Sequence, residues 1–151
     1  MHPPTKTKAE LALELGRAMA ELRIYLRQHI QAKIKEQGIG LTFEMLEVMS
    51  CLWRQDGINQ QEIADFTLRD KSSMTYLLDN LAKRQLVTRA EDEHDRRNKL
   101  IYLTQQGQEL REQLYPWALE VYEAASEEAQ PAELEQAVSL LSRMTGSLKK
   151  T

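Results

Sequence analysis

The sequence is poor in the residues that cross-link small proteins or bind metals. Its 151 residues include one cysteine, Cys51, which excludes an internal disulfide. The three histidines, His2, His29 and His94, lie far apart in the sequence, so no zinc-type ligand cluster and no cofactor are expected. The longest stretch without Asp, Glu, Lys or Arg is nine residues, Leu100 to Gln108, whereas a membrane-spanning helix needs roughly 20.

Composition and length are those of a globular chain. Apolar residues make up 42% and charged residues 28%, which is enough for a core and unlike a disordered segment. The length fits one compact domain, or a small domain with helical extensions. Residues 1–6 lack the apolar core of a secretory signal, so a cytoplasmic location is expected.

The net charge of -3 is distributed unevenly. Residues 41–68 carry one base and five acids, whereas residues 69–99 carry eight bases and six acids. A nucleic-acid-binding protein needs a local basic face rather than a basic total. An ordinary mixed surface explains the basic segment equally well at this point, because the isoelectric point is only about 5.7.

The spacing of apolar residues predicts the element order α-α-α-α-β-β-α-α. The expected helices cover about 7–36, 42–54, 59–67 and 70–85, then one from about 104 and one from Pro131; the expected strands cover 86–90 and 99–103. Phe66 counts among the apolar residues of the third helix. Pro116 lies inside the fifth helix and is expected to kink or interrupt it.

The third and fourth helices are joined by a very short turn, and a hairpin follows at once. This order outlines a winged helix-turn-helix, in which a short helix braces a second one that enters the DNA major groove. The fold class is therefore mainly α with a small β-hairpin. The expected parts are an N-terminal helix (1–40), a winged helix-turn-helix lobe (41–104) and C-terminal helices (105–151), forming one intertwined domain. The apolar face of the N-terminal helix is long for so small a domain, which indicates a partner helix from another chain.

Hydrogen-bonding and basic side chains occupy the positions where such a fold contacts DNA. The candidate contacts are Lys71, Ser72, Ser73, Thr75 and Tyr76 on the fourth helix, and Arg96, Arg97 and Lys99 at the hairpin. Serine and threonine in a first helical turn are often only cap residues, and paired arginines in a loop are often only solvated. The interpretation as a DNA surface depends on their occurring together, in this order.

The hairpin resembles the wing of MarR-type regulators. The segment from Asp95 to Gly107 matches the pattern D-x-R-x5-L-T-x-x-G. The segments 61–64, 70–75, 77–81 and 83–87 are also similar to that family, so the resemblance covers about 41–107 by motif.

The resemblance implies a homodimer that binds a palindromic operator in double-stranded DNA, usually as a repressor. It implies that the N-terminal helix (1–40) and the C-terminal helices (105–151) are the dimerisation helices. It implies that helix 70–85 enters the major groove and wing 91–98 the minor groove, that Arg97 inserts there, and that Asp95 pairs with Arg97 and sets the wing. Asn80 departs from the arginine that many members carry. Arg97 could instead be purely structural, held by Asp95.

Many members of the family respond to phenolic or other lipophilic small molecules bound where the dimer helices meet the winged-helix lobe. The corresponding candidate pocket residues are Tyr25, His29, Met45, Met49, Trp53 and Trp117. All six could equally be core residues, since methionine fills irregular cores as readily as pockets. Cys51 is expected to be structural rather than a redox sensor, because little lowers its pKa.

The sequence leaves one alternative class of function open and does not support another. A winged-helix protein-interaction module without DNA binding is the alternative, supported by the net acidity and by Glu91, Asp92, Glu93 and Asp95 around the wing. An enzyme is not expected, because the sequence has no nucleophile-base-acid set, phosphate loop or metal-ligand spacing. The sequence therefore favours a dimeric, ligand-responsive transcriptional regulator.

Overall fold

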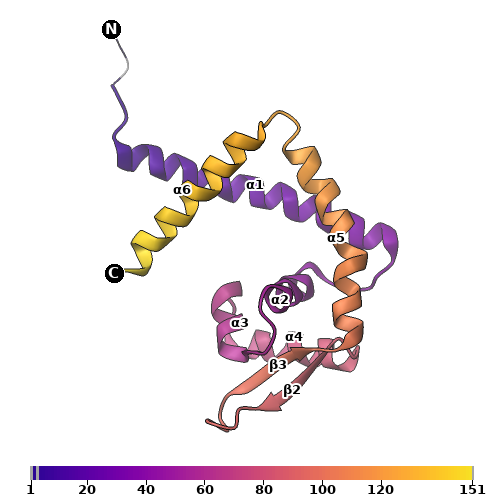
Figure 1. Cartoon of the computed structure of the whole chain (residues 1–151). Helices are drawn as coiled ribbons and strands as arrows, with labels where there is room; N and C mark the ends of the chain where they lie inside the picture. The colour runs from indigo at the N-terminus through magenta and orange to yellow at the C-terminus, as the bar shows by residue number, and fades with distance from the viewer. Residues whose placement is uncertain (1, 3, 151) are drawn as a thin grey trace.

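The computed structural model describes residue 2 and residues 4–150 (Figure 1). Its helices are α1 (Lys8–Gln37), α2 (Phe43–Arg54), α3 (Gln60–Thr67), α4 (Lys71–Lys83), α5 (Gln105–Ala125) and α6 (Pro131–Lys149). A lobe of α2, α3, α4 and the strands lies at one side of the molecule. Three helices, α1, α5 and α6, which we call the arms, extend away from it. No helix in the described part of the chain combines the length and apolarity needed to cross a membrane.

Helix boundaries follow the local capping signals of the sequence. Side-chain oxygens of Thr7, Thr42, Asn59, Asp70 and Thr104 each accept a backbone N–H in the first turn of the helix that follows. Gly38 ends α1 with a left-handed φ of 65°, which glycine adopts without a Cβ penalty. These caps explain why the expected helix starts agree closely with the observed ones.

Three short strands form one antiparallel sheet in the order β1-β3-β2. They are β1 (Ile58–Asn59), β2 (Val87–Glu91) and β3 (Lys99–Leu103). The hairpin pairs Val87 with Leu103 and Glu91 with Lys99, so residues 92–98 form its loop. The sequence predicted the hairpin and missed β1, whose two residues become a strand only by pairing with β3.

The core lies inside the lobe. Its buried side chains come from every element there and include Val48, Met49, Leu52, Ile58, Ile63, Met74, Leu78, Leu81, Val87 and Ile101. Among the described residues no polar or charged residue is fully buried. The apolar side of α4 is thus fixed against α2, α3 and the sheet, which determines which side of α4 faces outward.

The expected interruption of the fifth helix at Pro116 was wrong, and Phe66 of α3 lies outside the core. Phe66 is 72% exposed, whereas Ile63 and Ala64 of the same helix are buried. The helix α5 is not interrupted at Pro116 but runs continuously to Ala125. Proline removes one backbone hydrogen bond, and the remaining turns and the packing of α5 against α1 maintain the helix.

Candidate DNA interface

The helix α4 exposes polar side chains on the N-terminal half of its outer side. Lys71, Ser72 and Tyr76 are exposed, while Met74 and Leu77 on the opposite side are buried. The Tyr76 ring is outside the core, with 67% of the residue accessible. This half of α4 is therefore available to a groove of DNA without any rearrangement of the core.

The start of α4 is held by Asp70. Its Oδ1 accepts the backbone N–H of Ser73 at 2.7 Å. That hydrogen bond from Ser73 is the main reason why the pKa of the Asp70 carboxyl lies below its usual value. The backbone N–H of Ser73 is used by this cap, and its side chain is half-buried. Ser72 is the more exposed of the two serines.

Thr75 is exposed, but its hydroxyl is already engaged. It donates to the carbonyl oxygen of Lys71 at 2.9 Å and accepts from Nε2 of Gln60 at 2.8 Å. Gln60 is the first residue of α3, so this pair joins the two helices of the helix-turn-helix. Gln60 could not be singled out from the sequence, since a glutamine at a helix start carries no signal of a partner 15 residues away.

The hairpin loop is shaped by its own aspartates. Asp95 Oδ1 accepts the backbone N–H of Arg97 at 3.0 Å and lies 3.5 Å from Arg97 Nε. Asp92 Oδ1 likewise accepts the backbone N–H of His94 at 2.9 Å. The Arg97 side chain is 94% exposed. The loop is thus held by short local turns, while the guanidinium extends into solvent.

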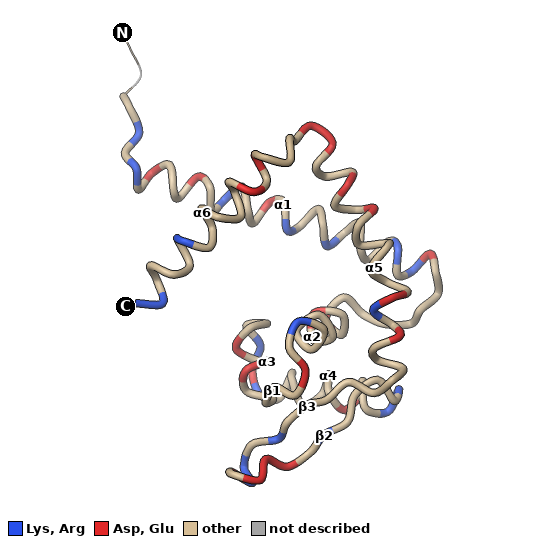
Figure 2. The backbone as a smooth tube through the Cα atoms, viewed as in Figure 1, with Lys and Arg blue, Asp and Glu red and all other residues tan. Residues whose placement is uncertain are grey.

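Charges of both signs adjoin at the tip of the hairpin (Figure 2). Arg96, Arg97 and Lys99 are exposed on the side leading into β3, and the acids Glu91, Asp92, Glu93 and Asp95 precede them. The basic residues of the wing therefore lie together on the half of the loop that leads into β3. The neighbouring acids weaken the field that these bases present to a polyanion.

An ion pair that the sequence did not suggest joins the hairpin to α4. Arg89 on β2 places its NH1 nitrogen 2.7 Å from Oδ1 of Asp79, and its NH2 donates to the carbonyl oxygen of Thr75 at 3.4 Å. Its Nε is buried without a hydrogen-bond partner. Arg89 thus fixes the root of the wing against the middle of α4.

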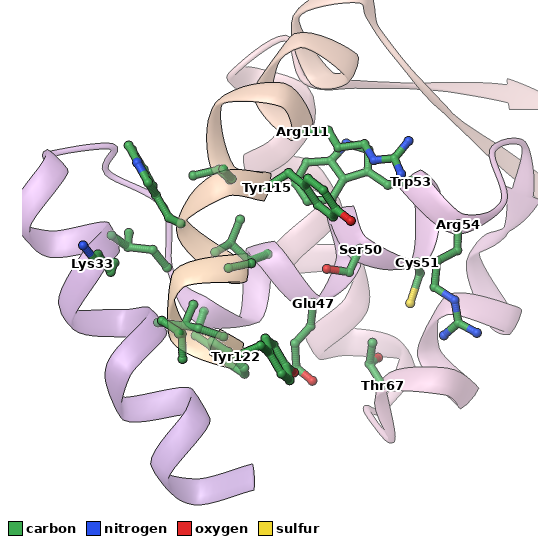
Figure 3. Close-up of a pocket in the computed structure, with 18 of the residues that line it drawn as sticks. Lys33, Glu47, Ser50, Cys51, Trp53, Arg54, Thr67, Arg111, Tyr115 and Tyr122 are labelled. Atoms are coloured by element: carbon green, nitrogen blue, oxygen red, sulfur yellow. The ribbon is translucent and has the colours of Figure 1, made fainter. Parts of the chain in front are cut away.

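A cavity of about 900 Å³ lies between the lobe and two of the arms, α1 and α5 (Figure 3). Its aromatic lining consists of Phe43, Trp53, Phe66, Tyr115, Trp117 and Tyr122, and its charged lining of Arg23, Lys33, Glu47, Arg54 and Arg111. This volume is within the usual range for small-molecule sites, which are mostly apolar with a few polar groups.

The observed lining differs from the expected one. Trp53 and Trp117 line the cavity as expected. Met45 and Met49 do not, because both are buried in the core of the lobe. Tyr25 and His29 are exposed on α1, outside the cavity lining. The tyrosines of α5 were missed because Tyr115 and Tyr122 fall outside the apolar stripe by which that helix was recognised.

Cys51 also lines the cavity and is half-buried. Burial raises the pKa of its thiol, and the nearby Arg54 opposes that rise only in part. The thiol is therefore protonated at neutral pH, which agrees with the expected structural role.

Together, a short helix α3, a helix α4 with a polar outer side and a hairpin with a basic tip define a winged helix-turn-helix protein. Residues 41–99 match the model of the MarR family. The transcriptional regulator YkoM of Bacillus subtilis (strain 168), described as uncharacterized and of the HTH type, is 29% identical over 138 residues, covering 90% of this chain and 87% of YkoM.

Solved structures agree along nearly the whole chain. A MarR transcriptional regulator from Methanosarcina mazei Go1 superposes with a TM-score of 0.77 at 28% identity, covering 91% of this chain and 98% of that one. MepR of S. aureus, solved in its DNA-binding conformation, has a TM-score of 0.75 at 26% identity, covering 89% and 98%.

Residues 41–99 therefore carry a MarR-family winged helix, and most of the chain is similar in structure to MarR-family transcriptional regulators. Its winged helix is a DNA-binding unit, and the family is one of regulators rather than of enzymes. The protein-interaction module without DNA binding is therefore set aside.

Proposed function

We propose that this regulator is a cytoplasmic repressor that binds a palindromic operator as a homodimer and is released by a small lipophilic or phenolic ligand. The helix α4 enters the major groove with Lys71, Ser72 and Tyr76, and wing residues 91–98 enter the minor groove with Arg97. Thr75 and Ser73 contribute mainly by holding α4 in place. The observation that carries this proposal is the exposed polar half of α4 beside a hairpin whose Arg97 is 94% exposed.

The proposal of a homodimer, with 1–40 and 105–151 as dimerisation segments around the lobe 41–104, is supported by apolar surface on the arms. The helix α6 has no buried residue. The exposed apolar side chains are Leu11, Leu13, Met19, Leu22, Ile24 and Tyr25 on α1, and Leu134, Val138, Leu140 and Leu148 on α6. Apolar surface of this extent on one chain marks a protein interface. A second copy supplies the same surface by two-fold symmetry.

The ligand proposal rests on the cavity. Its aromatic walls suit a flat apolar molecule, and its position between α1, α5 and the lobe lets an occupant change the angle at which each lobe is held. In a dimer such a change alters the distance between the two α4 helices, which must fit two half-sites.

Binding to the DNA upstream of the protein's own gene tests the repressor proposal. Anisotropy titrations at 50 and 200 mM salt compare the wild type with Arg97→Ala and with Arg143→Ala, a control on α6 at the opposite end of the molecule. Arg97→Ala is expected to weaken binding and to reduce the salt slope by about one per chain, and so by about two for the dimer. Equal binding by the wild type and Arg97→Ala would contradict the proposed role of the wing.

A further inference from the structure

Glu47 on α2 lies between two arginines from distant parts of the chain. Its Oε1 accepts from NH2 of Arg69 at 3.1 Å, and its Oε2 accepts from NH2 of Arg23 at 2.7 Å. Arg23 belongs to α1, and Arg69 lies in the turn between α3 and α4. A single carboxylate thus uses each of its oxygens for a different element.

Arg69 depends on this carboxylate for its charge balance. Its side chain is 24% exposed and that of Glu47 is 16% exposed, so water screens the pair only in part. The Nε of Arg69 is buried without a hydrogen-bond partner. Removing one member of a partly buried pair leaves the other charge without compensation, which costs more than the pair itself contributes.

The turn that carries Arg69 is strained. Leu68 has a φ of 54°, a left-handed conformation that leucine rarely adopts, and it is 93% exposed, so no packing of its own side chain holds it there. The backbone bonds from Leu68 to Asp65 and from Arg69 to Ala64 close the turn. The ion pair of Arg69 with Glu47 is the side-chain contact that fastens it to α2.

This turn leads directly into the DNA-binding helix. Arg69 precedes Asp70, the residue that caps α4. A shift of Arg69 therefore moves the first turn of α4, which carries Lys71 and Ser72. Glu47 also lines the cavity, so the pair lies where the arms, the cavity and the recognition helix meet.

We propose that Glu47 is a positioning residue for DNA binding, which holds the start of α4 through Arg69 and ties it to α1 through Arg23. Glu47 does not itself contact DNA in this proposal. Its effect on DNA is exerted through the placement of Lys71 and Ser72.

The direction in which DNA affinity changes when the charge of Glu47 is removed distinguishes a positioning role from a general electrostatic effect. Glu47→Gln removes an acid and makes the protein less negative, which by field alone strengthens binding to a polyanion. A positioning role requires the opposite result. Glu44→Gln is the matched control, since Glu44 lies one turn earlier on α2 and pairs with Arg27 of the same helix α1. The charge of Arg69 is only the smallest of the causes that act on the pKa of Glu44, whereas Glu47 hydrogen-bonds to Arg69 directly.

The DNA probe is a fluorescein-labelled 30-base-pair duplex selected from a random pool by the wild-type protein. Glu47→Gln is expected to bind this duplex roughly tenfold more weakly, whereas Glu44→Gln stays within about twofold of the wild type. Binding by Glu47→Gln that equals or exceeds wild-type binding overturns the proposal, and so does an equal loss in Glu44→Gln.

A double-mutant cycle identifies Arg69 as the partner. Arg69→Gln is expected to match Glu47→Gln, and the double variant is expected to lose no more than either single one. Fully additive losses, with a lower salt slope in Arg69→Gln, would show instead that Arg69 binds phosphate independently and would overturn the proposal.

Hydrogen exchange in the DNA-free protein tests the same idea without DNA. Amides of residues 65–76 are expected to exchange several-fold faster in Glu47→Gln than in the wild type or Glu44→Gln, while the amides of α5 remain unchanged. Unchanged exchange in residues 65–76 overturns the proposal. The two proposals can fail separately. If the wild-type protein selects no duplex but residues 65–76 still exchange faster in Glu47→Gln, Glu47 holds the start of α4 as proposed, and the proposed operator binding is wrong.

Discussion

A Cβ atom placed on Gly107 would lie 2.3 Å from the carbonyl oxygen of Leu86. The first turn of α5 therefore packs directly on the backbone that leads from α4 into β2. Trp53 Nε1 donates to the Gly107 carbonyl oxygen at 2.9 Å from the α2 side. The glycine that ends the wing motif is thus required where α5 leaves the lobe.

Gly107→Ala is expected to destabilise the protein by about 1 to 3 kcal/mol, because a backbone carbonyl cannot move aside as a flexible side chain can. Urea unfolding at a fixed protein concentration measures the change. A loss in the free energy of unfolding would be opposite to the usual effect, since alanine ordinarily stabilises a helix by roughly 0.5 to 1 kcal/mol over glycine. Gly146→Ala on α6 is the control, with no atom within 4 Å of its added Cβ, and it is expected not to lower stability. Equal effects of the two variants would refute the close contact with Leu86.

Asp79→Asn is expected to weaken DNA binding by roughly two- to fivefold, even though it removes a negative charge. The reason is the loss of the 2.7 Å ion pair with Arg89, which fixes the wing root on α4. Both partners are partly exposed, so the effect is modest. Glu93→Gln, which removes an acid from the hairpin loop, is expected to strengthen binding. Anisotropy with a wild-type-selected duplex distinguishes the two, and a gain in both variants would contradict the role of Arg89.

Acid is expected to weaken the start of α4. The hydrogen bond from Ser73 lowers the pKa of Asp70, so the charged cap contributes stability above the unfolded-state pKa. That contribution begins to decline near about pH 4 and is lost as the pH falls through the lower folded pKa. Urea unfolding of the wild type and Asp70→Asn between pH 7 and pH 3 checks this. The advantage of the wild type is expected to shrink with acid, and an advantage that grows would contradict the sign.

Cys51 is expected to react slowly with iodoacetamide at pH 7, because burial raises its pKa and the thiolate is the reactive form. Its rate is expected to rise as the pH is increased, and to remain below that of N-acetylcysteine at each pH. Mass spectrometry of the intact protein follows the reaction. A rate at pH 7 equal to or above that of the free thiol would show an activated cysteine.

Much of the fold could be predicted because its signals are local. The Thr42, Asn59 and Asp70 caps each act within three residues, and the expected strand 99–103 coincides with β3. The role of Asp95 in the wing turn was implied by the family resemblance, and its Oδ1 accepts the backbone N–H of Arg97 two residues away.

The contacts that position the DNA-binding elements could not be predicted in this way. Gln60 meets Thr75 across 15 residues, and Glu47 meets Arg69 across 22. Each depends on the angle between helices, which no local pattern of residue types specifies. The cavity lining was only partly foreseen for the same reason, because Tyr122 reaches it only through the placement of α5.

The composition of the protein–DNA complex decides whether this chain binds a palindromic operator as a dimer. Duplexes selected by the wild-type protein are sequenced, and their complexes are weighed by native mass spectrometry. We expect an inverted repeat with half-site centres about 10 base pairs apart and two chains bound per duplex. One chain bound to a single asymmetric site would contradict it.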